Sequence, residues 1–364
     1  PYMGNKNSKK QNSKKRLVLL DAHAILHRAY HALPDFTAPS GEPTGALYGL
    51  VAMLLKIIEE LKPDYITACF DLPEPTYRHD VYAQYKAGRA KTDDILVTQI
   101  IRSRDIFEAF GIRIYDHVGF EADDMLGTIV EQTKKMKDIE IVIASGDMDT
   151  LQLITKKKVQ VYTLRKGIKD TVMYDEEMVR ERFGFGPEHI ADYKGLRGDP
   201  SDNIPGIVGI GEKTATDLIK AFGSIDALYK KLAKSEALFQ KIGISPRIIA
   251  LLKANEEEAQ FSKMLATIRR DAPIMFVLPP KSWREQLAVS RVLDLFAEFG
   301  FRTLAGRVRQ LFGGAQNVGE KNNTEEAETT EQISDDMLRK TAVALWLLRS
   351  DITNPTADDI SDYG

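Results

Sequence analysis

The sequence predicts an α/β protein built on a mostly parallel sheet between helices, followed by a helical second half. Short apolar segments alternate with amphipathic helical patterns between residues 16 and 145, which is typical of parallel sheets covered on both faces. From residue 188 to about residue 268 only helical patterns continue, so this part is expected to form a separate subdomain.

The expected elements of the first half are short. Each strand is a brief apolar run, and each helix carries apolar residues at the spacing of one helical face, as Leu47, Leu50, Leu54 and Ile58 do. The predicted strands span residues 16–21, 65–71, 112–115 and 139–145. The predicted helices span residues 47–61, 95–110 and 125–136.

Composition excludes several classes of protein. With 43% hydrophobic and 28% charged residues, the chain can bury a core. Its one cysteine, Cys69, excludes a disulfide framework or a thiolate metal cluster and favours a reducing, cytoplasmic setting. No apolar run approaches the roughly 18 residues of a membrane span, so no membrane contact is expected. Because the net charge is −3, nucleic-acid binding would require local basic clusters.

The two ends of the chain differ from its middle. Residues 1–16 predict a disordered basic tail, and residues 313–336 predict an acidic linker. Residues 337–364 begin with a helical apolar pattern, so we expect the start of a further domain or a C-terminal helix. Between the ends we expect an α/β core over residues 17–187 and a helical subdomain over residues 188–312.

Aspartates follow three of the predicted strands. Asp21 ends the first strand, Asp71 ends the second, and Asp147 and Asp149 follow the last. Because ligands bind beyond the carboxyl ends of strands in an open parallel sheet, these acids are expected to meet at one edge. Five more acids lie where a loop enters a helix and in a polar turn: Glu121, Asp123, Asp124, Asp199 and Asp202.

Nine carboxylates in one cleft would repel one another unless cations neutralised them. Oxygen ligands favour Mg²⁺ or Mn²⁺ over zinc, and a site with this many acids can hold two ions for in-line phosphoryl displacement. Taken singly, these acids could equally be helix-dipole partners or turn formers. Only their shared position at strand ends favours the metal site.

A glycine-rich segment precedes a helical run in the second half. Residues 204–215 read Ile-Pro-Gly-Ile-Val-Gly-Ile-Gly-Glu-Lys-Thr-Ala, which resembles a helix-hairpin-helix motif. Glycines before a helix let backbone N–H groups approach a phosphate, and such motifs hold DNA without reading its sequence. The candidate contacts are Gly206, Gly209, Gly211, Lys213 and Thr214.

Cationic and aromatic residues alternate in residues 74–94. Arg78, Lys86 and Arg89 lie among tyrosines that include Tyr85. Cations can hold phosphates and aromatic rings can stack on unpaired bases, so this pattern suits single-stranded nucleic acid. A solvated loop could carry similar charges, but this segment directly follows the second acidic strand.

These residues, in this order, resemble the structure-specific 5′-nuclease (flap endonuclease) family, in the branch that forms the N-terminal domain of bacterial DNA polymerase I. The resemblance covers about residues 17–312, with Ala22 standing where bacterial members commonly have Gly. It rests on residues 20–23, 43–49, 70–71, 77–79, 85–89, 121–124, 146–149 and 198–215.

The resemblance implies a PIN-like fold with a helical arch over about residues 72–95 and a C-terminal helix-hairpin-helix subdomain. It also implies roles for individual residues. The first metal ion would be held by Asp21, Asp71, Glu121 and Asp123, with Asp124 close by. The second would be held by Asp147, Asp149 and Asp202, with Asp199 in support. Lys86 and Arg89 would act on the scissile phosphate, and DNA would also contact Thr44, Gly45, Arg78 and Tyr85.

The activity implied by the resemblance is Mg²⁺-dependent hydrolysis of DNA at a 5′ end or 5′ flap, in replication, including RNA primer removal, and in repair. Two Mg²⁺ ions, replaceable by Mn²⁺, and a K⁺ ion at the helix-hairpin-helix are the expected cofactors. We expect a monomer at the bacterial nucleoid, with a polymerase domain in the same chain as a possible neighbour.

Other functions remain open. A PIN-type ribonuclease would use the same chemistry on RNA, although PIN domains are usually shorter and lack a helix-hairpin-helix. A non-catalytic helix-hairpin-helix module would not need nine acids facing a polyanion. A haloacid-dehalogenase-like phosphatase would need Asp-x-Asp after the first strand, where this chain has Asp21-Ala22-His23.

Overall fold

One six-stranded sheet forms the centre of the protein. The structure, a computed structural model, describes residues 14–166 and 170–313, so most of the expected tail and linker and all of residues 337–364 lie outside it. The strand order is β3-β2-β1-β4-β5-β6, with every neighbouring pair parallel except β5 and β6. The strands are β1 (Lys15–Asp21), β2 (Tyr65–Cys69), β3 (Arg113–Tyr115), β4 (Ile139–Ala144), β5 (Val159–Lys166) and β6 (Asp170–Tyr174).

The predicted mostly parallel sheet is confirmed, and the sequence missed two of its strands. In β5, apolar Val159 and Val161 flank polar Gln160, an alternation that a search for continuous apolar runs does not detect. The strand predicted to end at Asp71 ends at Cys69, so Asp71 lies in the loop beyond it.

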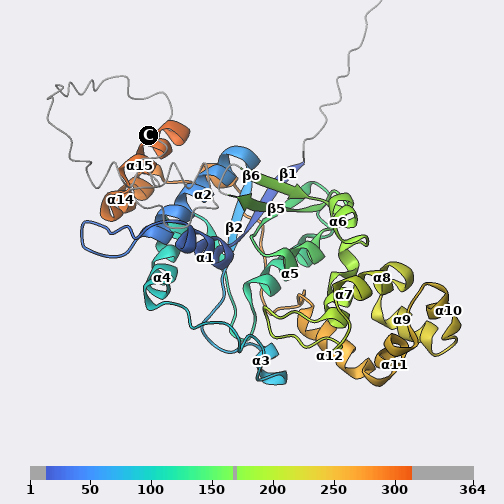
Figure 1. The fold of residues 1–364 in the computed structure, drawn as a ribbon. Coiled ribbons are helices and arrows are strands. Elements are labelled where there is room, and N and C mark those ends of the chain that lie inside the picture. Colours follow the sequence, from blue (N-terminus) through green and yellow to red (C-terminus); the bar gives the residue numbers. More distant parts are fainter. Residues whose placement is uncertain (1–13, 167–169, 314–364) are drawn as a thin grey trace, which may run out of the picture.

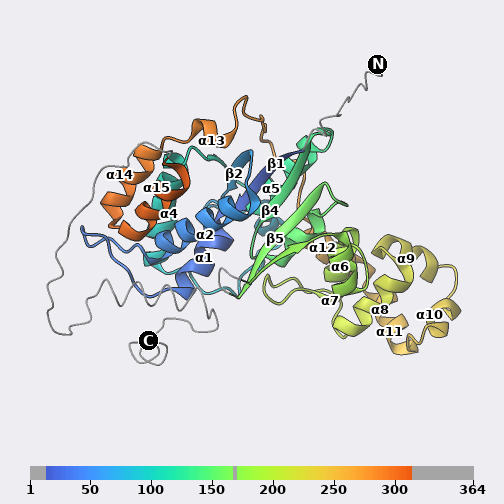
Figure 2. The same ribbon diagram turned by 90° about the horizontal axis from the view of Figure 1, so that it is seen from above.

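Helices cover both faces of the sheet because successive strand residues point to opposite sides. Val18 and Leu20 of β1 pack into the core formed with α1, α2 and α4, whereas Leu17 and Leu19 pack into the core that contains α5. Figure 2 shows these helices on opposite sides of the sheet. Their bounds are α1 (Ala22–Ala32), α2 (Gly45–Leu61), α4 (Asp94–Ala109) and α5 (Ala122–Thr133).

The second half is helical, as predicted, and lies on the α5 side of the sheet (Figure 1). The close approach of Arg269 to α5 depends on Gly127, where an added Cβ would lie 2.4 Å from the carbonyl oxygen of Arg269. The helices are α6 (Glu176–Phe183), α7 (Ile190–Arg197), α8 (Glu212–Phe222), α9 (Ile225–Leu232), α10 (Ala237–Lys241), α11 (Pro246–Ala254) and α12 (Glu256–Ala266).

The last described helices return to the other side of the sheet. Trp283 donates a hydrogen bond from Nε1 to the carbonyl of Phe110 at 2.8 Å, and Phe296 and Val308 join the α2 and α4 core. These helices are α13 (Trp283–Gln286), α14 (Val289–Phe299) and α15 (Arg302–Phe312).

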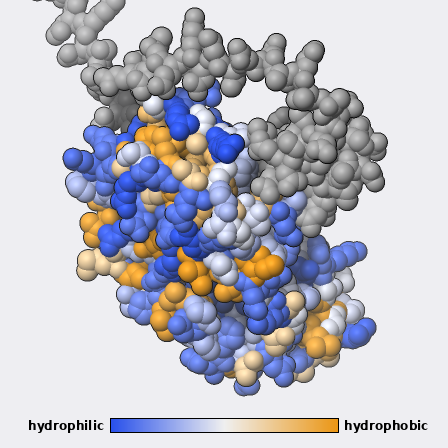
Figure 3. Space-filling model, turned by 90° about the vertical axis from the view of Figure 1, so that its left-hand side faces the viewer, coloured by the Kyte–Doolittle hydropathy of each residue, from blue (hydrophilic) through white to orange (hydrophobic). Residues whose placement is uncertain are grey.

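Figure 3 shows one face of the molecule, on which hydrophobic side chains form separate patches among hydrophilic ones. In the part of the chain that the structure describes, no helix has both the length and the apolar character needed to cross a bilayer.

Candidate metal and DNA site

Strand ends and one helix start bring acids to the C-terminal edge of the sheet. Asp21, the last residue of β1, accepts hydrogen bonds from the N–H of Ala24 and from the hydroxyl of Ser145. Asp71, beyond β2, accepts from the N–H of Ala122 at 2.7 Å. The first turn of α5 is therefore fixed beside the strand ends.

Five of the predicted carboxylates line one cavity of about 340 Å³. Two predicted cations, Lys86 and Arg89, line it as well, together with His23 and His27 of α1. The carboxylates are those of Asp21, Asp71, Glu121, Asp123 and Asp147. The convergence predicted for them is present in the fold, and we refer to this space as the acidic cavity.

Crowding shifts the proton affinity of these acids. Burial, with repulsion from Asp71 and Asp147, raises the pKa of Asp21 to about 7. Burial also raises the pKa of Asp123 well above its usual value, and that of Asp149 to about 6, with the charge of Asp147 contributing to both. A cation placed among these groups would relieve the repulsion.

Protein cations hold several of the carboxylates. Lys86 Nζ lies 2.8 Å from Glu121 Oε1, Arg89 binds Asp202, and Lys194 binds Asp149. Within residues 14–166 and 170–313, no three His, Cys, Asp or Glu side chains lie close enough together to bind one metal ion as they stand. The acidic cavity still fits a hard divalent cation by its chemistry, because its candidate donors are crowded carboxylate oxygens.

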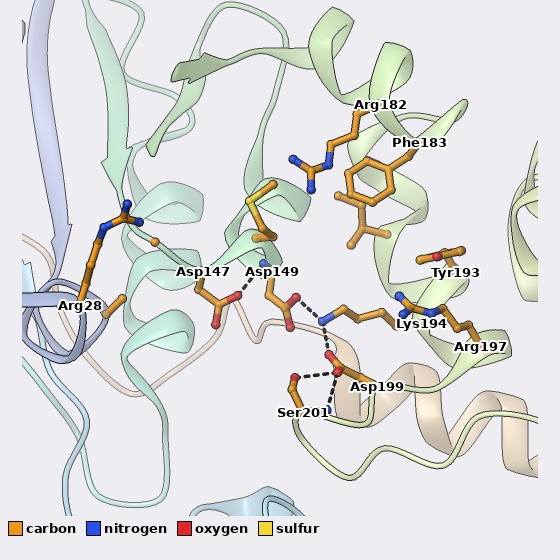
Figure 4. Close-up of a pocket in the computed structure, with 14 residues that line it drawn as sticks. Arg28, Asp147, Asp149, Arg182, Phe183, Tyr193, Lys194, Arg197, Asp199 and Ser201 are labelled. Atoms are coloured by element: carbon orange, nitrogen blue, oxygen red, sulfur yellow. Dashed lines mark hydrogen bonds and ion pairs between the residues drawn. The ribbon is translucent and has the colours of Figure 1, made fainter. Parts of the chain in front are cut away.

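A second cavity of about 550 Å³ shares Asp147 with the first and extends toward α6 and α7. Four of its lining residues are cationic and were missed by the sequence analysis: Arg28, Arg182, Lys194 and Arg197. Figure 4 shows Lys194 between Asp149 and Asp199. The spacing of Lys194 and Arg197, immediately before the predicted Gly198–Asp202 turn, is the signal that could have identified two of them. We refer to this space as the cationic cavity.

The segment of residues 72–95 contributes Lys86 and Arg89 to the lining of the acidic cavity. It contains one short helix, α3 (Tyr77–Val81), and otherwise mainly turns before α4 begins. Lys86 adopts a left-handed conformation with φ of 57°, and its backbone N–H donates to the carbonyl of Asp202 at 2.9 Å. This segment, which we call the arch segment, therefore places Lys86 and Arg89 beside the acids, as expected.

Two predicted contacts in the arch segment are wrong in this structure. Arg78 is only 3% exposed, and its guanidinium donates to both carboxylate oxygens of Asp124, so it cannot reach a DNA strand. Asp124 is fully buried, which removes it from the candidate metal ligands. Tyr85 is also buried, with its hydroxyl donating toward Glu121 and Asp202, so its ring is not available for stacking on bases.

The other residues predicted to contact DNA fall into a buried group and a more exposed group. Thr44 and Gly45 are buried at the start of α2, so the expected DNA contact there is wrong. Gly206 is also buried, and its N–H donates to the hydroxyl of Ser262. In contrast, Gly209, Gly211 and Lys213 are exposed and Thr214 is half-buried, all at or near the N-terminus of α8.

Comparison with known proteins identifies the family of the chain. Residues 16–184 match the family model of the 5′-3′ exonuclease N-terminal resolvase-like domain, and residues 185–286 match that of the 5′-3′ exonuclease C-terminal SAM fold. The chain belongs to the 5′-3′ exonuclease family. The family resemblance drawn from the motifs is confirmed.

Curated relatives of this 5′-3′ exonuclease family member are bacterial polymerases. DNA polymerase I of Bacillus subtilis strain 168 is 38% identical over 299 residues, which are 81% of this chain and 32% of that protein. DNA polymerase I of Chloroflexus aurantiacus is 38% identical over 302 residues, which are 81% of this chain and 30% of that protein. The chain thus spans about a third of the length of these relatives.

Solved structures show the same fold at low sequence identity. A zinc-bound T5 5′-exonuclease aligns with a TM-score of 0.56 at 20% identity, covering 82% of this chain and 98% of that one. Human GEN1 in complex with Holliday junction DNA aligns with a TM-score of 0.53 at 13% identity, covering 84% of this chain and 76% of that one. The α14 and α15 helices lie beyond both family-model matches.

Proposed function

We propose that this 5′-3′ exonuclease family member hydrolyses DNA phosphodiester bonds at a 5′ end or 5′ flap with the help of two Mg²⁺ ions. The observation that carries this proposal is the acidic cavity, where five carboxylates meet Lys86 and Arg89 of the arch segment. A polyanionic substrate can approach so many acids only if cations are bound there. The zinc-bound T5 5′-exonuclease, which shares the fold, supports a divalent ion.

The acids of the two cavities, together with Asp202, which pairs with Arg89, would hold the ions in two groups. Asp21, Asp71, Glu121 and Asp123 would hold the first ion. Asp147, Asp149 and Asp202 would hold the second, supported by Asp199. When bound, such ions supply Lewis-acid stabilisation of an in-line displacement, and Mn²⁺ could replace Mg²⁺ because it has similar ligand preferences.

Lys86 and Arg89 would bind the scissile phosphate. Both side chains line the acidic cavity, and they pair with the carboxylates of Glu121 and Asp202. Cations that neutralise those carboxylates would release the two side chains toward an incoming phosphate. There they would offset the negative charge that develops in the transition state. No side chain is needed as a general base in this scheme, because the metal site can provide the nucleophile.

Exposed backbone at the start of α8 would hold the DNA duplex. Gly209, Gly211, Lys213 and Thr214 lie at or near a helix N-terminus, where N–H groups favour phosphate, and a K⁺ ion could bridge them to the backbone. The cationic cavity would hold a phosphate-bearing strand on its way to the acidic cavity, with Arg182 and Arg197 as its more exposed cations.

The curated relatives suggest the cellular role. Because they are DNA polymerases, we infer that the chain acts in replication, including removal of RNA primers, and in repair. We also infer that it acts as a monomer on junction DNA, with a polymerase domain as its neighbour in the natural chain.

A 5′-flap duplex labelled at its 5′ end tests the proposal. With Mg²⁺, we expect release of a short product cut near the junction, and with EDTA we expect none. A matched single-stranded RNA is the second substrate. Equal or faster cleavage of RNA would replace the proposal with a PIN-type ribonuclease, and DNA binding without any cleavage would replace it with a non-catalytic module.

A further inference from the structure

The pair of Arg78 and Asp124 joins three parts of the chain that are far apart in sequence. Arg78 belongs to the arch segment and Asp124 to the first turn of α5, and two hydrogen bonds of 2.8 and 2.9 Å connect them. Arg78 also donates to the carbonyls of Leu265 and Thr267, each at 3.0 Å, at the end of α12. One guanidinium therefore fastens the arch segment to both the α/β core and the helical half.

Both side chains of the pair are buried. The side chain of Arg78 is 3% exposed and that of Asp124 is fully buried. Asp124 also accepts hydrogen bonds from the N–H groups of Glu121 at 3.1 Å and Arg269 at 2.8 Å. Buried charges need this degree of pairing, because the removal of one partner leaves the other charge without compensation.

Glu121 is the candidate metal ligand that this pair holds. Its backbone N–H donates to Asp124, and its side-chain Oε2 lies 3.3 Å from Nη1 of Arg78. The backbone and the side chain of Glu121 are thus both fixed by the pair, next to the acidic cavity.

We propose that Arg78 and Asp124 are positioning residues that set the metal affinity of the acidic cavity by fixing Glu121, without contacting the metal or the DNA themselves. This inference rests on the proposed function. Partners that orient a metal ligand typically change metal affinity or activity by about 10- to 100-fold when they are removed. A pair that served only folding would change stability and leave metal affinity intact.

Mn²⁺ binding by the DNA-free protein, followed by electron paramagnetic resonance, is the primary measurement. We expect Arg78→Lys to weaken Mn²⁺ binding at least about tenfold, because lysine keeps the charge but loses the planar fork that reaches both carboxylates and carbonyls. Asp124→Asn is expected to do the same. Cleavage of the flap substrate at limiting metal should fall in parallel.

A double variant separates positioning from folding. Removing one member of a buried ion pair leaves the other charge uncompensated, so Arg78→Met with Asp124→Asn should recover part of the melting temperature lost by Arg78→Met alone. Asparagine carries no charge but keeps an oxygen that can accept from the N–H groups that Asp124 binds. We expect its Mn²⁺ affinity to remain at least about tenfold weaker than that of the wild type, because Glu121 still lacks its contact with Arg78.

A second ion pair provides the matched control. Lys263 Nζ lies 2.7 Å from the buried Asp192 and joins α12 to α7, outside both cavities. Lys263→Met should lower the melting temperature without changing Mn²⁺ affinity. Recovery of wild-type Mn²⁺ affinity by the double variant, or unchanged affinity in both conservative variants, would overturn the inference. A wild-type protein that neither binds Mn²⁺ nor cleaves the flap would instead overturn the proposed function.

Discussion

Gln99 of α4 caps the N-terminus of α2 by accepting a hydrogen bond from the backbone N–H of Ala46 at 2.7 Å. Its oxygen also accepts from the N–H of Leu47 at 3.4 Å, while Thr44, the N-cap residue, makes no side-chain capping bond. The first donors of a helix need such partners when they are buried. The start of α2 is therefore occupied by another helix, which explains why it is closed to DNA.

Gln99→Leu is expected to destabilise the protein by about 1–3 kcal/mol, because it leaves buried N–H groups without an acceptor. Urea unfolding followed by circular dichroism measures the loss. Gln286→Leu is the control, since Gln286 is exposed and its replacement should stay within about 0.5 kcal/mol. Equal stability of the two variants would show that the cap contributes little.

Asp123→Asn and Asp147→Asn are expected to slow flap cleavage by on the order of a hundredfold or more, because each removes a carboxylate proposed to hold a catalytic ion. DNA binding, measured by fluorescence anisotropy without divalent metal, should largely survive. Asp138 immediately precedes β4 and is exposed, whereas Asp147 follows the same strand. Asp138→Asn should therefore cleave normally, and normal cleavage by both cavity variants would contradict the metal assignment.

Arg197→Ala tests the cationic cavity. If Arg197 contacts a phosphate, its removal should weaken DNA binding for all sequences and reduce the slope of log affinity against log salt concentration by about 1. Arg291 on α14 is 61% exposed and outside both cavities, so Arg291→Ala should leave the slope unchanged. An unaltered slope for Arg197→Ala would exclude that contact.

Two glycines of one motif are expected to respond differently to alanine. Gly206 has φ of +61°, and an added Cβ would lie 2.1 Å from the backbone nitrogen of Gly198, so Gly206→Ala should cost at least about 2 kcal/mol of stability. At Gly211 an added Cβ meets nothing within 4 Å. Gly211→Ala should therefore fold, with a cost of about 1 kcal/mol or less, and bind DNA more weakly. Thermal melts and anisotropy titrations would distinguish the two effects, and equal stabilities would contradict the packing role of Gly206.

The predicted acids at the strand ends show how far sequence reasoning reaches. Asp21 and Asp147 follow apolar strands, and parallel strands must end at the same edge, so their proximity follows from local pattern and sheet geometry. The order of the glycines before α8 likewise predicts an exposed helix start, because it depends on residues adjacent in the chain.

Partners from distant segments could not be predicted in the same way. Arg78 has the same local pattern as Lys86, a cation among tyrosines, yet one is buried against Asp124 and the other lines the acidic cavity. Burial depends on the packing of α12 and α5 around the arch segment, which no local spacing encodes.

The sequence by itself determined the α/β core, the helical second half and the set of acids that share an edge, because hydrophobic periodicity and strand direction are local properties. Only the tertiary structure decided which charges face the cavities and which face each other. The physical reason is that a buried charge must find its counter-charge in space, and here that partner comes from another part of the chain.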